Sequence, residues 1–285
     1  MNAIIMAAGT SSRFVPLSVE RPKGLLEVKG EILIERQIHQ LQEAGVDDIT
    51  IVTGYKAAMF DYLRNKYGVD TVNNEDFNRY NNTSSIICVL DRLNDTFICC
   101  SDHYFKNNVF LEPANESYYA ARYAKGVTGE YCLSYDDKDF ITEVSIGGRD
   151  AWYMAGHAFF AKPFSAKFRD IMLKEYAKES VRNGYWEDVY ISHIKELPMQ
   201  IRRYSDEDIF EFDTLDELRV FDESYMEDSR SKIVKQICRF ISCKDSELYG
   251  FQKIKHEGDH LQFTFFYKDD KYIYDNLNPL KINQQ

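Results

Sequence analysis

Small side chains and fixed positive charge gather near the start of the chain, within residues 4–26. An apolar run over residues 3–8 ends in four small residues, Gly9, Thr10, Ser11 and Ser12. Beside such a turn, a polyphosphate can lie against backbone N–H groups. Arg13 and Lys23 follow and supply positive charge. The stretch predicts a site for a nucleoside triphosphate, although it contains neither the P-loop pattern nor the GxGxxG fingerprint.

A carboxylate follows the most apolar predicted strand. Residues 96–101, TFICCS, predict a buried strand, and Asp102 and His103 come directly after it. Because ligands bind beyond the carboxyl ends of parallel strands, Asp102 is well placed to hold a divalent metal. Magnesium prefers oxygen ligands, so we expect His103 to be a neighbour of solvent or phosphate instead.

Aromatic residues stand beside acids in two parts of the sequence. Residues 185–190 read YWEDVY, and residues 118–161 are rich in tyrosine and include Trp152. Ring faces and carboxylates can contact one cation together, which favours a ligand with a quaternary ammonium group. For any single ring a place in the core remains an alternative. For Asp188 the alternative is a helix start, where a carboxylate is favourable.

Alternating strands and helices would position these residues. The predicted order is a strand at residues 3–8, a helix at 30–45, a strand at 49–53, a helix at 57–67 and strands at 69–72 and 96–101. This order is typical of a parallel sheet with helices on both faces. Its ligand-binding edge would carry both the opening loop and Asp102.

The second half of the sequence alternates with period two over shorter runs. Short strands are predicted at residues 118–123, 131–135, 141–146 and 152–161, with turns at 136–139 and at Gly147-Gly148. Three helices are predicted in this half and just before it, at residues 86–93, 165–183 and 214–226. Their expected N-terminal caps are Thr83 or Ser84, Ser165, and Thr214. A short strand at residues 209–213 precedes the last helix.

Composition limits the class of protein. With 285 residues, a net charge of −11 and a pI near 5.1, the chain has no basic stripe for a nucleic acid. Its six cysteines include no CxxC pair and read as reduced residues. No apolar run approaches the length of a membrane span, and no targeting peptide is predicted. We therefore expect a cytoplasmic protein.

The combination of Ala8-Gly9, Arg13, Pro16-Leu17, Pro22-Lys23 and Leu25-Leu26 resembles the signature of the nucleotidyltransferases that activate sugar 1-phosphates and choline phosphate. The resemblance covers residues 1–227. It implies an α/β fold of the nucleotide-diphospho-sugar transferase type, with a Rossmann-like, mostly parallel central sheet. It also implies a small antiparallel sheet on the substrate side.

The resemblance also implies roles for single residues. Arg13 and Lys23 would be catalytic, and Asp102 and Asp213 would hold Mg²⁺. The nucleotide would contact Ala8, Gly9, Thr10, Ser11 and Ser12, with its base read by Asn82 and Ser84. The second substrate would contact Tyr131, Trp186, Glu187, Tyr190 and Glu211.

The implied reaction joins CTP to phosphocholine, a small phosphate ester with a cationic head group, and releases pyrophosphate. Phosphoethanolamine, 2-aminoethylphosphonate and a hexose 1-phosphate remain alternative acceptors. A non-catalytic nucleotide-binding regulator also remains open, because the chain departs from the family pattern. Ser11 stands where many relatives have Gly, Tyr131 where the choline-phosphate members have Trp, and Glu187 where they have Asp.

Residues 228–285 predict a small α+β appendage, with a helix at 231–241 and strands at 249–255, 261–267 and 271–274. They resemble the start of the N-terminal lobe of a choline-kinase-like domain. Because His256-Glu257-Gly258 is a poor substitute for a phosphate-binding loop and no catalytic loop follows, we expect no kinase activity. The appendage is expected to pack on the main domain or on a second subunit, so a homodimer is possible.

Overall fold

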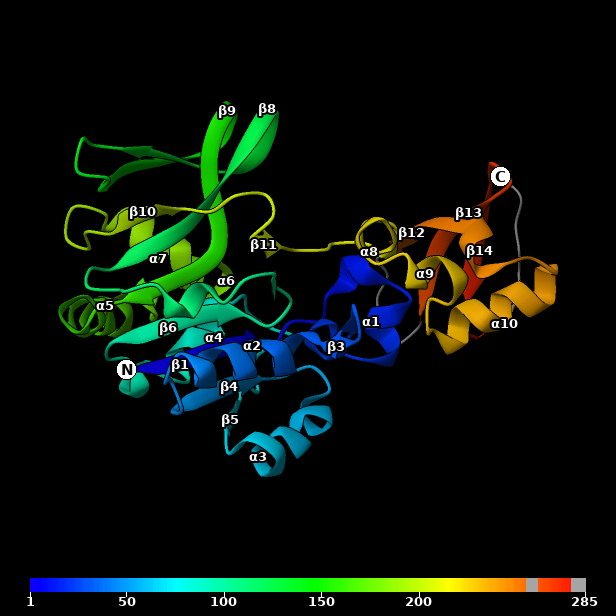
Figure 1. Cartoon of the computed structure of the whole chain (residues 1–285), viewed down its shortest axis with the longest axis horizontal. Helices are drawn as coiled ribbons and strands as arrows, with labels where there is room; N and C mark the ends of the chain where they lie inside the picture. Colours follow the sequence, from blue (N-terminus) through cyan, green and yellow to red (C-terminus); the bar gives the residue numbers. More distant parts are fainter. Residues whose placement is uncertain (255–260, 278–285) are drawn as a thin grey trace. The chain divides into compact units, whose positions relative to one another are not determined.

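The computed structural model describes residues 1–254 and 261–277, and Figure 1 traces its helices and strands. Contacts divide the chain into two compact units. Unit 1 comprises Met1–Gly9 and Leu33–Phe210, and unit 2 comprises Thr10–Ile32 and Glu211–Gln285. Each unit is thus built from two separate stretches of sequence. The domain boundary predicted at residue 227 stays a prediction.

A seven-stranded sheet forms the centre of unit 1. Its strands lie in the order β10 (Gln200–Arg203), β8 (Tyr118–Tyr135), β9 (Ile141–Phe160), β6 (Thr96–Cys100), β1 (Asn2–Ala7), β4 (Ile49–Thr53) and β5 (Asp70–Asn73). β1 pairs in parallel with both β4 and β6, so Ile4 lies between Thr50 and Ile98. β9 runs antiparallel to both β6 and β8. The predicted α/β class with a mostly parallel central sheet is confirmed.

The helices of unit 1 connect and cover these strands (Figure 1). They include α2 (Leu33–Glu43), α3 (Tyr62–Tyr67), α4 (Thr83–Ile87), α5 (Lys162–Glu175), α6 (Glu179–Asn183) and α7 (Trp186–Ser192). The helix predicted at residues 165–183 is divided into α5 and α6. Its N-cap is Ala161 and not Ser165, whose buried hydroxyl donates to the Asn94 carbonyl at 2.5 Å. None of the helices in the described part of the chain is long and apolar enough to cross a bilayer.

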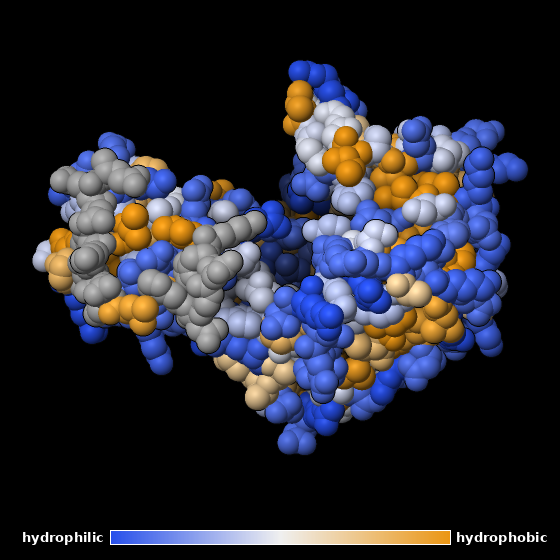
Figure 2. Space-filling model, turned by 180° about the vertical axis from the view of Figure 1, so that it is seen from behind, coloured by the Kyte–Doolittle hydropathy of each residue, from blue (hydrophilic) through white to orange (hydrophobic). Residues whose placement is uncertain are grey.

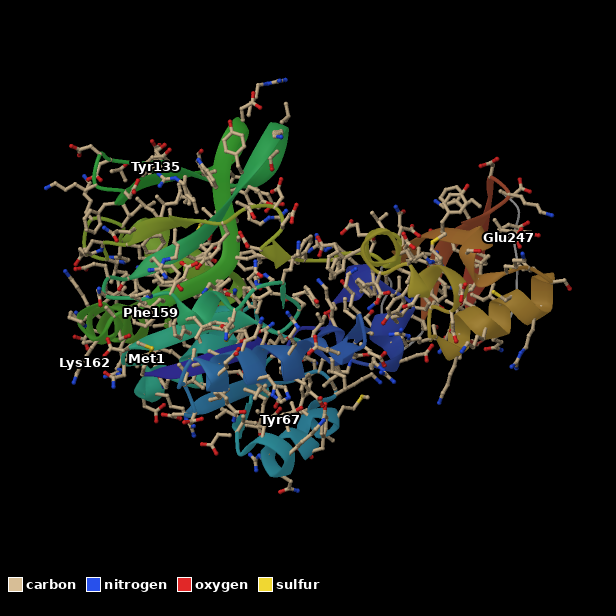
Figure 3. All side chains as sticks on the ribbon, in the orientation of Figure 1. Met1, Tyr67, Tyr135, Phe159, Lys162 and Glu247 are labelled. Atoms are coloured by element: carbon tan, nitrogen blue, oxygen red, sulfur yellow. The ribbon has the colours of Figure 1, made fainter. Side chains whose placement is uncertain are left out.

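The main core of unit 1 lies between one face of the sheet and helices α4, α5 and α7. Ile4 and Ile98 of the sheet belong to the same buried cluster as Phe168 of α5. Phe159 of β9 also lies inside the unit, whereas Lys162 at the start of α5 lies at its surface (Figure 3). The face in Figure 2 carries hydrophilic residues with hydrophobic patches between them. A buried apolar sheet of this kind gives its strand ends a fixed frame.

β8 and β9 form one long hairpin instead of the predicted series of short strands. The two strands contain 18 and 20 residues. The predicted turn near Asp136 joins them, and the Asp136 N–H donates to the Phe140 carbonyl at 2.9 Å. Gly147 and Gly148, by contrast, lie within β9 beside irregularities in its pairing with β8. Bulges absorb extra residues without ending a strand, so glycines there gave a false signal for a turn.

Unit 2 combines the segment after Gly9 with the C-terminal stretch. The first segment contains two short 3-10 turns (Ser12–Phe14 and Lys23–Leu25), α1 (Leu17–Glu20), β2 (Glu27–Val28) and β3 (Glu31–Ile32). The second contains α8 (Leu215–Phe221), α9 (Ser224–Glu227), α10 (Lys232–Ile241) and the antiparallel strands β12 (Leu248–Lys253), β13 (Gln262–Tyr267) and β14 (Asp270–Asp275). Thr214 caps α8 as predicted, because its hydroxyl accepts from the Glu217 N–H at 3.2 Å. Lys255 and residues 256–258 lie outside the described residues.

Candidate active site

The opening loop leaves β1 with an accessible backbone. Gly9 and Thr10 are exposed, and a side-chain carbon at Gly9 would meet no atom within 4 Å. Ser11 has φ 48° and ψ 47°, the left-handed conformation that glycine adopts most readily. Its carbonyl accepts from the Phe14 N–H at 2.9 Å, which starts the turn Ser12–Phe14. Ser11 therefore takes the backbone shape expected of the glycine that it replaces.

Four of the predicted site residues come together in unit 2. One Arg13 guanidinium nitrogen lies 2.7 Å from Asp213 Oδ2. Lys23 Nζ lies 3.8 Å from Asp213 Oδ1 and 3.9 Å from Glu211 Oε1. Because β11 (Ile209–Phe210) ends earlier than predicted, Glu211 and Asp213 lie on the connection to α8. We call Arg13, Lys23, Glu211 and Asp213 the charged cluster.

The two cations of the charged cluster differ in accessibility. The Lys23 side chain is only 5% exposed and is held near the Phe14 ring, 5.8 Å from its centroid. Arg13 is 74% exposed, so its guanidinium can reach a ligand. Burial raises the pKa of Asp213, while the charges of Lys23 and Arg13 oppose that rise. The two cations can bind phosphate oxygens directly, and the two carboxylates can coordinate a divalent metal.

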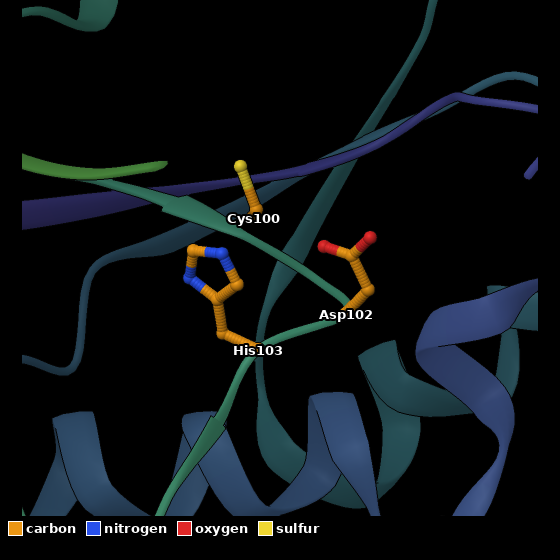
Figure 4. Close-up of side chains that lie close together, drawn as sticks. All are labelled: Cys100, Asp102 and His103. Carbon is orange, nitrogen blue, oxygen red and sulfur yellow. The ribbon is translucent and has the colours of Figure 1, made fainter. Parts of the chain in front are cut away.

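Asp102 lies in a firmly held turn after β6. Its carboxylate and the ligand atoms of Cys100 and His103 lie within 4.8 Å of one another (Figure 4). The Gln37 amide donates to the carbonyls of Cys100 and His103, at 2.8 and 2.9 Å. Of the two neighbours expected for His103, solvent is wrong, since this residue is 1% exposed and packs beside Gly156, and phosphate stays a prediction.

The predicted base-reading residues are engaged within unit 1. The Asn82 side chain accepts from the Trp186 N–H at 2.8 Å and donates to Glu187 Oε2 at 3.2 Å. The buried Ser84 hydroxyl donates to the Asn81 carbonyl at 2.7 Å. Neither Thr83 nor Ser84 caps α4 through its side chain, which corrects that expectation. These bonds join the loop before α4 to the start of α7, and a contact of Asn82 or Ser84 with a base stays a prediction.

Glu187 is the most perturbed carboxylate of unit 1. Its Oε1 accepts from the Tyr119 hydroxyl at 3.0 Å, and burial raises its pKa to about 7. The bonds from Asn82 and Tyr119 oppose this rise. Nearby, the Tyr131 hydroxyl donates to Asp188 Oδ1 at 3.1 Å. A cation here would gain from the ionised form of Glu187 and would favour it in return.

The rings of Trp186 and Tyr190 lie in the core. Trp186 is 3% exposed and stacks on Tyr119 with ring centroids 5.7 Å apart. Tyr190 is 0% exposed and packs near Phe164. Their predicted contact with a substrate stays a prediction that this burial does not favour. Tyr131, which is half-buried, keeps a better position for such a contact.

Sequence reasoning missed the partners that hold these residues in place. Tyr119 lies on β8 and Gln37 on α2, far in sequence from Glu187 and Asp102. His157 is a separate case: it starts the apolar end of β9 and is buried in an aromatic group, where its Nε2 lies 3.0 Å from the Tyr118 hydroxyl. Burial lowers the pKa of His157 to about 3. Alternation along a strand predicts which residues are buried, but it does not identify the residue that each one contacts.

A mostly parallel sheet with a carboxylate after a central strand, and a loop carrying Arg and Lys, are features found in enzymes that transfer nucleotidyl groups. A profile of the MobA-like NTP transferase domain matches residues 3–125. The choline-phosphate cytidylyltransferase of Streptococcus pneumoniae is 32% identical over 78% of this chain and 97% of its own length. The 2-aminoethylphosphonate cytidylyltransferase of Lancefieldella rimae is 36% identical over 79% and 93%.

Solved structures agree with these relatives. The CTP:phosphocholine cytidylyltransferase from S. pneumoniae superposes with a TM-score of 0.75, at 32% identity over 78% of this chain and 98% of that one. A putative glucose-1-phosphate thymidylyltransferase from Bacillus anthracis, at 16% identity, shares the fold with a TM-score of 0.62 over 79% and 94%. The chain therefore belongs to the nucleotidyltransferase family that includes these cytidylyltransferases, as its sequence signature indicated.

Proposed function

We propose that this nucleotidyltransferase joins CTP to phosphocholine and forms CDP-choline and pyrophosphate. The charged cluster is the observation that carries the proposal. It gathers Arg13 and Lys23 from the opening loop with Glu211 and Asp213 from a stretch almost two hundred residues later. The identity to choline-phosphate cytidylyltransferases along nearly their whole length supports CTP and phosphocholine, and the identity to a 2-aminoethylphosphonate cytidylyltransferase keeps that second acceptor open.

The reaction needs positioning and neutralisation of charge. An oxygen of the acceptor phosphate attacks the α-phosphorus of CTP, and the bond from that phosphorus to the bridging oxygen breaks as pyrophosphate leaves. We assign Arg13 to the leaving phosphates, since its guanidinium is exposed and a guanidinium can form paired bonds with phosphate oxygens. Lys23, held in place by burial, would offset the charge that builds up on the transferred group.

Residues 8–12 would bind the triphosphate through backbone N–H groups, and Asn82 and Ser84 would read the cytosine base. The exposed backbone at Gly9 supports the first role. For the second role the support is the family resemblance. Asn82 would then act while it also holds Trp186 and Glu187 in place.

The carboxylates suit Mg²⁺, which prefers oxygen donors. We propose Asp102 and Asp213 as its ligands. Asp213 is partly desolvated and its pKa is raised, so a nearby cation would stabilise its ionised form. When bound, the metal would neutralise negative charge on the phosphates.

Glu187, Glu211 and Tyr131 are the residues that we propose for the cationic head group of the acceptor. A second acceptor, 2-aminoethylphosphonate, is favoured by the burial of Trp186 and Tyr190. With these rings in the core, fewer aromatic faces are available to a quaternary ammonium. A primary ammonium can instead donate hydrogen bonds to the carboxylates.

Acceptor competition tests this choice. With CTP fixed, kcat/KM would be measured for phosphocholine, phosphoethanolamine, 2-aminoethylphosphonate and glucose 1-phosphate. We expect phosphocholine to give the highest value. A higher value for 2-aminoethylphosphonate would instead assign the enzyme to the second acceptor, and a preference for glucose 1-phosphate would contradict the cationic site.

We further propose that the enzyme works in the cytoplasm with its cysteines reduced. The six cysteines are free. The possible homodimer stays a prediction.

A further inference from the structure

We propose that the C-terminal tail, residues 231–254 and 261–277, positions the charged cluster for the triphosphate, and that Glu20 is the positioning residue that links the tail to the opening loop. The proposal rests on the role given above to Arg13. It assigns a function to a stretch whose only predicted role was packing.

Glu20 ends α1, shortly after Arg13, and bonds to the first turn of α10. Its Oε1 accepts from the Ser231 hydroxyl at 2.5 Å and from the Ile233 N–H at 3.0 Å. Its Oε2 accepts from the Lys232 N–H at 3.0 Å. Free N–H groups and the positive end of a helix dipole both favour a carboxylate here. One side chain of the opening loop thus supplies acceptors for the N-terminus of α10.

Further contacts join the tail to the same segment. Strand β12 packs against the turn Ser12–Phe14, which contains Arg13. At the junction before the tail, Arg230 donates to the Glu27 carbonyl at 2.9 Å, and the Tyr225 hydroxyl donates to the same oxygen at 2.6 Å. C-terminal residues therefore pack against the opening segment that carries Arg13.

The carboxylate side of the charged cluster is tied to the tail as well. Helix α8 begins two residues after Asp213, and its buried Arg219 reaches into the tail. One Arg219 nitrogen lies 2.7 Å from Asp245 Oδ1, and another donates to the Leu248 carbonyl at 2.5 Å. Asp216 Oδ2 accepts from the Gly250 N–H at 2.7 Å. The tail thus contacts both segments that carry the charged cluster. These contacts fix the position of Arg13 relative to Asp213.

Glu20→Ala tests the proposal in the full-length protein. The variant removes three hydrogen bonds and touches no residue assigned to substrate. We expect KM for CTP to rise about tenfold while KM for the acceptor stays unchanged. Amide hydrogen exchange in residues 10–32 should be faster in the variant than in the wild type. Glu223→Ala removes an exposed carboxylate of the same unit and should change none of these values.

Four outcomes decide the proposal. A raised KM for CTP with faster exchange in residues 10–32 supports it. An unchanged KM for CTP in an active enzyme overturns it. A lower kcat with both KM values unchanged also overturns it, because that result indicates a smaller folded fraction. If wild-type protein neither binds nor transfers CTP, the proposed function fails. Hydrogen exchange then decides whether Glu20 positions the loop, and unchanged exchange overturns that claim too.

Discussion

In our proposal, Lys23 and Arg13 divide the work of binding phosphate. Lys23 is buried and lies almost equally far from two carboxylates, so its place is fixed by its surroundings. Arg13 is exposed and bonded to one of the same carboxylates, so it can exchange that partner for a phosphate. Asp102 adds a carboxylate at the end of β6, in a turn whose carbonyls are held by Gln37.

Asp102→Asn tests the metal assignment at this scale. The substitution keeps the size of the side chain and removes its charge, so the fold should persist while kcat falls about a hundredfold or more. Steady-state turnover with circular dichroism checks both statements. Asp91→Asn changes an exposed residue of the same unit and should leave the rate unchanged. Near-normal turnover of the Asp102 variant would refute the assignment.

Glu187 predicts a pH dependence of stability. Its pKa is about 7 in the folded protein and near 4.5 when unfolded, so the native state binds the proton more tightly. The contribution of Glu187 to stability is therefore full below about pH 4.5 and is lost as pH rises through about 7. Relative to Glu187→Gln, the wild type should lose up to about 3 kcal/mol of unfolding free energy across this range.

Urea titrations of wild type and Glu187→Gln at several pH values would measure this difference. Glu143→Gln, at an exposed position, serves as the control. Its free energy of unfolding should differ little from that of the wild type at any pH. A flat difference for Glu187 would show that its carboxyl has an ordinary pKa.

At the scale of elements, the opening strands and α2 could be predicted because hydrophobic periodicity and strand order carry that information. β4 has the predicted bounds, residues 49–53. The hairpin β8–β9 could not be predicted as one pair, since glycines signal turns and bulges alike. Arg13 and Lys23 of the charged cluster could be predicted from residue type and position, and Glu211 and Asp213 only from the family resemblance. The partners of Glu187 and Asp102 could not be found, because they come from distant elements brought close only by tertiary packing.

Gly156 tests how tightly β9 packs on the Asp102 turn. At φ +68°, an added Cβ would lie 2.8 Å from His103 Cε1, so Gly156→Ala suffers both backbone strain and a clash. We expect a loss of about 2 to 4 kcal/mol in unfolding free energy. Gly126→Ala is a matched control with φ +80° and no atom within 4 Å of the added carbon, so it should lose only about 1 kcal/mol. Equal losses would mean that the His103 contact does not constrain β9.

At the scale of the whole molecule, the chain matches related cytidylyltransferases along nearly their full length. It also carries C-terminal residues that pack within unit 2. The charge of −11 makes local cations important, because anionic substrates would otherwise be repelled. The charged cluster supplies such cations. In our proposal, the tail holds the cations of the charged cluster in a fixed position relative to its carboxylates.

Pyrophosphate release with phosphocholine and each of CTP, UTP, ATP and GTP, with and without a chelator, tests the central claim most directly. The account predicts rapid release with CTP, formation of CDP-choline in equal amount, and loss of both when Mg²⁺ is removed. Absence of pyrophosphate with every nucleotide, in a folded protein supplied with Mg²⁺, would contradict it.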